Sequence, residues 1–385
     1  MVDKGESIMN AALFKKMMFV FMLLFLGEAC ASSGYSLVNK IPPLTADNAL
    51  NDILISDGGD FMVLVPDNGA DAYVYQGGEI MPLDIPGGVN TDVKSVMLLS
   101  GSKKLLVQTD KVFYLGMFGQ GWQKIPLPNI SKNALIASIV ASDQKELTIL
   151  VVTDDGMAYS YSNNVWQQLQ FPEFPNADFM GSAMSADGSV RLIDGFKVAA
   201  LYKNGQWSAL QDPALPKDIS IENVAMSASG DVMVISTENQ GNYIYAHNEW
   251  KPLNVNGKNN QGLLTSLVMV NNATEIVAAI QYDAYYLYQN GQWSKIQQTI
   301  NPNINFSSSA ISEDGDKIIV ASYDMGAFMW QNGKWTKITI DGAVDGDVNY
   351  ARFAAKGNVF AIAGGTYTAF NIDGKWKYLL APQDD

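Results

Sequence analysis

Cysteine, histidine and arginine are almost absent from this chain of 385 residues, and each scarcity removes a class of function. Cys30 is the only cysteine, so the chain cannot form an internal disulfide. His247 is the only histidine, which excludes a His/Cys zinc cluster and leaves Ser-His-Asp chemistry one candidate residue. Arg191 and Arg352 are the only arginines, too few for the bidentate phosphate and base contacts of most nucleic-acid binders.

Positive charge is scarce in general. The chain has 25 Lys and Arg against 39 Asp and Glu, a formal net charge of −14. Such a surface repels nucleic-acid backbones and anionic lipid headgroups, so we expect no nucleic-acid partner and no general membrane binding. With 48% hydrophobic and 17% charged residues, the chain is apolar enough to bury a large core.

The first 31 residues predict an export signal. Lys15 and Lys16 precede an apolar run over 17–26, and small residues follow over 27–31. The run is too short to span a bilayer comfortably, although an uncleaved anchor stays an alternative. Cys30 is a lipidation candidate because residues 26–30 resemble a bacterial lipoprotein signal, and residues 29–31 also fit an Ala-x-Ala cleavage before Ser32. We therefore expect a bacterial cell-envelope protein, either periplasmic or lipid-anchored through Cys30, or else a secreted one.

An internal repeat of about 42 residues covers nearly all of the rest. The tryptophans that mark it are Trp122, Trp166, Trp207, Trp250, Trp293, Trp335 and Trp376. An apolar run that ends at Ile55 opens an eighth unit, which has no tryptophan. Short strands repeating at this period predict an all-β fold, an eight-bladed β-propeller of four-stranded antiparallel blades.

Turn residues divide each unit into four short runs. Residues 221–253 contain four apolar or alternating runs separated by such residues, which predicts a four-stranded meander. Asn204-Gly205, at the last turn of its unit, is a strong hairpin signal because both central residues of a type I′ turn need positive φ. His247 occupies the corresponding turn of the next unit, which favours a turn role over a catalytic one.

The turn between the first two runs carries a family resemblance. Residues 185–188, 312–315 and 227–230 match a Ser-x-Asp-Gly-like turn that follows a first strand. In this respect the chain resembles the WD-repeat and related propeller superfamily, although every unit lacks the Trp-Asp and Gly-His signatures. The resemblance implies the fold and a tendency toward protein binding, and it implies no catalytic residue.

The repeat sets the domain organisation. We expect the export signal at 1–31, an N-terminal segment at 32–44, the propeller at 45–380 and a tail at 381–385. Residues 35–44 resemble the last strand of a unit. They are expected either to pair onto the final blade and close the ring or to replace residues 376–380 there.

One tryptophan per unit at a fixed position favours packing between blades, with a ring of sugar-stacking platforms as the alternative. The long connections between units, on the face away from the tight turns, form the candidate binding face. In the connection at 171–179, Phe171, Phe174 and Phe179 are candidate anchors for a partner, or else they pack against the blade edge.

Catalytic groups are scarce, so we expect no catalytic residue, no cofactor and no metal site. The carboxylates at 345–347 and 313–316, Glu313 among them, could hold calcium but more commonly belong to turns. The leading hypothesis is a non-catalytic envelope propeller that acts as a protein-binding or scaffolding module. It resembles in plan the propeller lipoprotein of the outer-membrane assembly machinery, although the spacing of its repeated tryptophans differs from that family's Gly-x-x-x-Trp pattern. The alternative is a carbohydrate-binding lectin or a glycoside-processing propeller, since an acidic propeller has many paired carboxylates. The sequence carries no signal for an oligomeric state.

Overall fold

The structure is a computed structural model. It describes residues 50–66, 72–86, 93–99, 103–132, 134–174, 177–237, 239–255, 258–259, 264–280, 284–296, 306–322, 325–339, 348–355, 357–364, 367–372 and 374–380. The regular structure in these ranges is entirely β-strand. Over the same ranges there is no helix with the length and hydropathy needed to span a membrane.

The strands form eight four-stranded antiparallel sheets and one two-stranded hairpin. The first blade contains β1 (Leu50–Ile55), β2 (Phe61–Pro66), β3 (Tyr73–Gln76) and β4 (Glu79–Pro82). The second contains β5 (Val93–Leu99), β6 (Lys104–Thr109), β7 (Val112–Met117) and β8 (Gly121–Pro126). The third contains β9 (Ile136–Ser142), β10 (Thr148–Thr153), β11 (Ala158–Ser162) and β12 (Val165–Gln168). The fourth contains β13 (Phe179–Met184), β14 (Arg191–Gly195), β15 (Val198–Lys203) and β16 (Gln206–Ala209).

The second half of the chain repeats this plan. The fifth blade contains β17 (Ile221–Met226), β18 (Met233–Thr237), β19 (Asn242–Ala246) and β20 (Glu249–Pro252). The sixth contains β23 (Leu264–Met269), β24 (Glu275–Ile280), β25 (Ala284–Gln289) and β26 (Gln292–Lys295). The seventh contains β27 (Phe306–Ile311), β28 (Lys317–Ser322), β29 (Gly326–Gln331) and β30 (Lys334–Lys337). The eighth contains β31 (Val348–Phe353), β32 (Val359–Gly364), β33 (Tyr367–Ile372) and β34 (Lys375–Leu380). A short hairpin of β21 (Asn254–Val255) and β22 (Lys258–Asn259) lies in the connection between the fifth and sixth blades.

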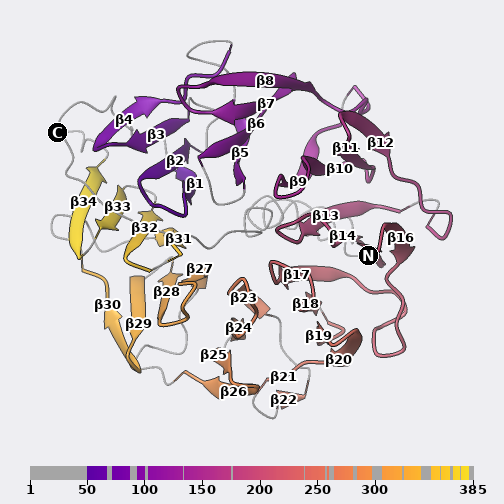
Figure 1. The fold of residues 1–385 in the computed structure, drawn as a ribbon. Helices are drawn as coiled ribbons and strands as arrows, with labels where there is room; N and C mark the ends of the chain where they lie inside the picture. The colour runs from indigo at the N-terminus through magenta and orange to yellow at the C-terminus, as the bar shows by residue number, and fades with distance from the viewer. Residues whose placement is uncertain are drawn as a thin grey trace, which may run out of the picture.

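The blades are arranged in chain order around a common centre (Figure 1). The first strand of each blade lies nearest the centre and the fourth lies at the rim, and the indigo first blade comes to lie beside the yellow eighth blade. The prediction of an eight-bladed β-propeller is confirmed. The four strands of each blade are antiparallel and follow one another in chain order. The ends of the first and third strands therefore lie on one face of the ring, which we call the short-turn face, and the ends of the second and fourth strands lie on the other, which we call the long-loop face.

The predicted turn chemistry is confirmed. Asn204 and Gly205 have φ of 54° and 81°, as a type I′ hairpin turn requires. His247 occupies the equivalent turn with φ of 55° and is exposed, so the structure gives the only histidine a turn role.

The core is divided into eight hydrophobic clusters, one at each contact between neighbouring blades. Each marker tryptophan belongs to the cluster shared with the preceding blade. Trp166, for example, packs with Phe113 and Leu115 of the second blade, and its Nε1 donates to the carbonyl oxygen of Pro126 in β8 (2.7 Å). The tryptophans therefore join consecutive blades.

Four of these tryptophans pack against a tyrosine directly opposite on the third strand. The ring centroids are 5.1 to 5.4 Å apart, with interplanar angles of 50 to 55°. The pairs are Tyr161 with Trp166, Tyr202 with Trp207, Tyr245 with Trp250, and Tyr288 with Trp293. Tilted pairs at this distance are favourable beyond the area they bury. The packing role expected for the tryptophans is confirmed.

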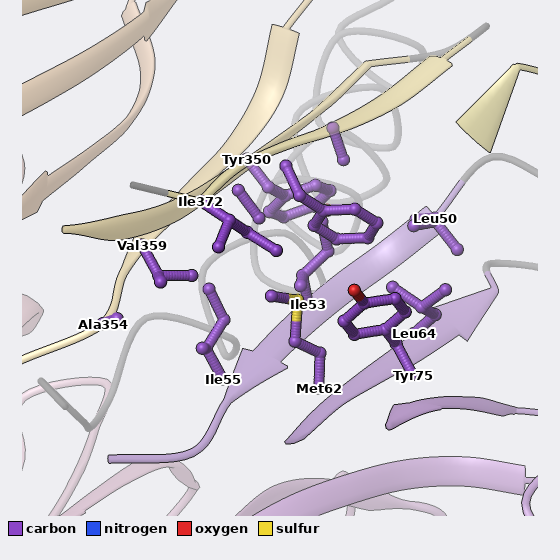
Figure 2. Packing of buried hydrophobic residues seen from close by; sticks show 13 residues of the cluster. Leu50, Ile53, Ile55, Met62, Leu64, Tyr75, Tyr350, Ala354, Val359 and Ile372 are labelled. Carbon is purple, nitrogen blue, oxygen red and sulfur yellow. The ribbon is translucent and has the colours of Figure 1, made fainter. Parts of the chain in front are cut away.

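The ring closes through side chains that join the first and eighth blades. In this cluster Ile53 and Met62 of the first blade face Tyr350 and Ile372 of the eighth (Figure 2). The final blade keeps its own fourth strand, β34, paired with β33, so residues 376–380 are not replaced there. The segment at 35–44 lies outside the described residues.

The inner strands carry small polar side chains at the contacts between blades. Ser138 of β9 and Ser182 of β13 share a hydrogen bond of 2.6 Å between their Oγ atoms. Ser266 of β23 and Ser309 of β27 are paired in the same way. Ser182 and Ser309 are 1% and 2% exposed between neighbouring inner strands. Small residues allow the inner strands to approach closely at the narrow radius of the ring.

Candidate functional site

The predicted phenylalanine anchors lie between the third and fourth blades. Phe171 and Phe179 are 7% and 4% exposed, and their rings meet edge to face at 5.3 Å. Phe171 also contacts Trp207, with ring centroids 5.7 Å apart. Phe174 is half-buried against the same cluster. The structure therefore gives Phe171 and Phe179 the packing role that the sequence left open, and Phe174 is the member of the trio with exposed surface.

Three of the large exposed apolar side chains lie on segments next to this connection. Leu135 is 69% exposed, Phe196 58% and Met157 38%. Leu135 immediately precedes β9, Met157 follows the turn after β10, and Phe196 lies in the turn after β14. All three belong to the long-loop face at the third and fourth blades, and we call them the apolar patch. Val165, 64% exposed, belongs to the short-turn face of the third blade.

Backbone hydrogen bonds fix one half of the patch. The N–H of Leu135 donates to Oδ1 of Asp154 (2.8 Å), and the N–H of Asp154 donates to the carbonyl oxygen of Leu135 (2.9 Å). The hydroxyl of Thr153 donates to Asp155, and this bond holds the pKa of the Asp155 carboxyl below its usual range. These hydrogen bonds thus hold in place the turn that carries Met157.

The other half is tied to the same turn. The N–H of Phe179 donates to the carbonyl oxygen of Gly156 (3.4 Å), and the N–H of Phe196 donates to that of Asp178 (3.3 Å). A Cβ on Gly156 would lie 2.9 Å from the carbonyl oxygen of Ala177, so the connection passes directly over this glycine. These bonds join the segments that carry Leu135, Met157 and Phe196 into one ordered rim.

Charges around the patch are predominantly acidic. The exposed carboxylates on these segments are those of Asp154, Asp155, Glu173 and Asp178. The exposed cations nearby are Lys132 and Lys197. A surface that carries exposed apolar side chains and an excess of carboxylates attracts a partner with apolar and basic side chains.

One buried carboxyl lies beneath the patch. Asp194, two residues before Phe196, is 5% exposed in the contact with the fifth blade. Burial raises its pKa to about 7, and repulsion from Glu222 adds to the effect. Gly181 makes room for this side chain, since a Cβ there would lie 2.7 Å from Oδ1 of Asp194. The carboxyl is enclosed, so it is presented to the blade interior rather than to the face.

Asp314 accepts hydrogen bonds from the Ser312 hydroxyl (2.6 Å) and the Asp316 N–H (3.2 Å), as an ordinary turn residue does. The residues at 345–347 and Cys30 lie outside the described part of the chain. Over the described ranges, no three His, Cys, Asp or Glu side chains are grouped so that they could hold a metal ion.

Sequence reasoning did not identify the apolar patch. A signal was present in Phe196, a large aromatic residue in a hairpin turn, where polar residues and glycine are usual. Leu135 and Met157 carried no comparable signal, since apolar residues next to strands are usually core.

Comparison with known proteins yields the fold alone. No family model matches the chain, and no curated protein matches its sequence. Among solved structures, the C-terminal WD40 domain of Sif2 matches with a TM-score of 0.64 and 10% identity, over 91% of this chain and all of that one. The computationally designed Ika8 protein matches with a TM-score of 0.61 and 12% identity over the same shares. KlHsv2 with loop 6CD replaced by a Gly-Ser linker matches with a TM-score of 0.50 and 12% identity, over 75% of this chain and 97% of that one. The resemblance to WD-repeat propellers is therefore structural.

Proposed function

We propose that the chain is a non-catalytic, exported β-propeller of the bacterial cell envelope, and that its long-loop face binds a protein partner through the apolar patch. The observation that supports this is that Leu135, Met157 and Phe196 are exposed on one face, on segments that backbone hydrogen bonds join together. Exposed apolar side chains that cluster on a soluble protein mark interaction sites, whereas single ones are ordinary. The half-buried Phe174, in the connection on the same face, extends the proposed surface.

The expected partner is a protein segment that offers apolar side chains with lysine or arginine beside them. Apolar anchors would cover the patch, and basic residues would face the carboxylates of Asp154, Asp155 and Asp178. Rigid loops suit this role because little ordering entropy is lost when a partner binds. The overall charge of −14 favours the same class of partner through long-range attraction.

Photo-crosslinking tests this proposal. A crosslinking amino acid at position 196 is expected to capture a protein from envelope extracts, and the combined variant Leu135→Ser/Met157→Ser/Phe196→Ser is expected to bind the purified partner at least about 10-fold more weakly. Val165→Ser is the matched control, since it removes an equally exposed apolar side chain from the other face. Equal binding by the triple variant and the parent would refute the role of the patch. Retention on a glycan array, with no protein captured, would favour the alternative of a lectin or glycoside-processing propeller.

Export is proposed from the sequence alone, and mass spectrometry of the mature N-terminus tests it. An acylated Cys30 would mean that the ring is anchored to a membrane, and a free Ser32 would mean a soluble periplasmic or secreted protein. An intact N-terminus at residue 1 in a cell-envelope fraction would contradict both.

A further inference from the structure

The register of the sheets reveals one charged residue at a core position. In each blade, the marker-tryptophan position on the fourth strand pairs with one residue of the third strand. That third-strand residue pairs in turn with one residue of the second strand. In seven blades this second-strand residue is apolar: Met62, Leu105, Ile149, Met233, Ile276, Ile318 and Phe360. In the fourth blade it is Arg191, opposite Tyr202. A cation thus replaces an apolar side chain at one of eight equivalent contacts between blades.

The residue that meets Arg191 is exceptional in the same way. The Nη1 of Arg191 donates to the hydroxyl of Ser160 in the third blade (3.3 Å). Ser160 immediately precedes the tyrosine opposite Trp166. The equivalent third-strand residues in the other blades are apolar: Val74, Leu115, Leu201, Ile244, Leu287, Met329 and Phe370. Both sides of this contact are therefore polar, where the other blades have apolar side chains.

Arg191 is buried, and it forms no ion pair with any described residue. The residue is 8% exposed. Its Nε donates to the carbonyl oxygen of Gly188 (2.9 Å), and its guanidinium lies 4.3 Å from the centroid of the Tyr202 ring. Burial lowers its pKa, and the carboxylate of Glu146 acts on it only at longer range. Across the described residues, no carboxylate lies within salt-bridge distance of Arg191. A buried cation is normally paired, so a negative counterpart is expected from outside the chain.

A recess on the short-turn face leads to this guanidinium. Its volume is about 570 Å³, within the range of small-molecule sites. Of the other cations that line it, Lys145 is paired with Asp187, and Lys203 donates to the Tyr245 hydroxyl (2.7 Å). The Nη2 of Arg191 donates to no described residue. Arg191 therefore keeps N–H donors free toward the recess.

We propose that this recess binds a small carboxylic acid whose carboxylate forms a two-pronged ion pair with Arg191. Guanidinium and carboxylate match in planar geometry, and such pairs are among the strongest hydrogen-bonded contacts. Three acidic residues, Glu146, Asp187 and Asp231, also line the recess and oppose the more highly charged phosphate. A single negative charge fits this balance. The site lies on the face opposite the apolar patch and does not depend on the proposed function.

Calorimetric titration and thermal melting of the full-length protein test the proposal. The probes are sodium acetate, succinate, benzoate and glucuronate, each compared with sodium chloride at equal ionic strength. At least one acid is expected to raise the melting temperature by about 4 °C at 100 times its dissociation constant. Arg191→Met, which installs the residue found in two equivalent blades, is expected to weaken binding at least about 10-fold. Without ligand this variant is expected to melt at the same temperature as the parent or higher, because a buried unpaired charge is removed.

Two controls separate charge from geometry. Lys251→Met removes an exposed cation elsewhere in the ring and is expected to leave binding unchanged. Arg191→Lys keeps the charge but loses the planar fork, and an intermediate affinity is expected. Failure of all four acids to bind, or equal binding by Arg191→Met, would overturn the proposal. A lower melting temperature of Arg191→Met without ligand would show a structural role instead. Binding only of a glutamate hexapeptide with blocked ends would overturn the small acid in favour of an acidic protein segment.

Discussion

Arg352 and Asp52 form an ion pair across the closure of the ring, with 3.0 Å between Nη2 and Oδ1, although 300 residues separate them in the chain. Arg352 lies on the inner strand β31 and Asp52 on the inner strand β1. Asp52 is 5% exposed, and its burial raises the pKa of its carboxyl despite the nearby guanidinium. Removing one of the two charges alone would leave the other buried without its counterpart, which lowers the free energy of unfolding.

Arg352→Met is expected to destabilise the fold by about 3 kcal/mol, because it leaves the Asp52 carboxylate buried without its cation. Urea unfolding at pH 7 measures the loss. The double variant Asp52→Asn/Arg352→Met is the matched control and is expected to recover most of the stability. If the double variant were as unstable as the sum of both single changes, the two residues would not be coupled.

Trp250→Ala is expected to cost about 3 to 5 kcal/mol, as truncations of core aromatics do. Trp250 is 6% exposed and packs against Tyr245, with 5.2 Å between the ring centroids. Thermal and urea unfolding measure the effect, with the exposed Val165→Ser as control. A melt of Trp250→Ala that matches the parent would contradict the packing role.

Asp194→Asn is expected to stabilise the protein at high pH. The pKa of Asp194 is raised to about 7 in the fold from 3.8, so the folded protein holds a proton that the unfolded chain releases. Stability from this group is therefore full below pH 3.8, falls as the pH rises toward 7, and stays low above it. The gain from asparagine should be on the order of 3 kcal/mol at pH 8 and vanish near pH 4. Urea unfolding at both pH values, with Asp231→Asn as exposed control, measures it, and a gain independent of pH would argue against this assignment.

Substitution by alanine is expected to destabilise the fold less at Gly205 than at Gly195. Gly205 has φ of 81° and open space around it, so Gly205→Ala is expected to cost about 1 kcal/mol from backbone strain alone. A Cβ on Gly195 would lie 1.9 Å from the carbonyl oxygen of Asp178, and neither backbone can yield cheaply. Gly195→Ala is therefore expected to cost about 3 kcal/mol or more. Unfolding of the two variants side by side tests the order, and equal losses would mean that the connection at Asp178 moves freely.

The architecture was predictable because it rests on features that recur. Trp166, Trp207 and Trp250 hold one position in successive units, and residues such as Asn204 and Gly205 mark turns whose φ values few other residues adopt. Because the same pattern recurs from unit to unit, it identifies the strands even where a single short run could be assigned in more than one way. Ring closure by Asp52 and Arg352 was not predictable, since it joins two residues that no local pattern relates.

The candidate sites depend on single residues that break the repeat. Leu135 and Phe171 are both apolar residues in connections, yet one is exposed and the other buried. The difference arises from how each connection crosses the neighbouring turn, which the sequence does not encode locally. Arg191 was visible as a rare arginine, but its significance required the register that aligns it with seven apolar counterparts.

The contiguity of each blade has a consequence for how the ring comes apart. No strand is shared between the first and eighth blades among the described residues, so the closure is one side-chain contact among eight. Opening a closed circle at one contact yields an arc in which every blade still touches a neighbour, and two openings are needed to release a fragment. Because two contacts between blades must open before a fragment is released, the closed ring favours slow separation of its blades. It also means that the chain could begin at another blade boundary, and such circular permutants should preserve the same set of interfaces.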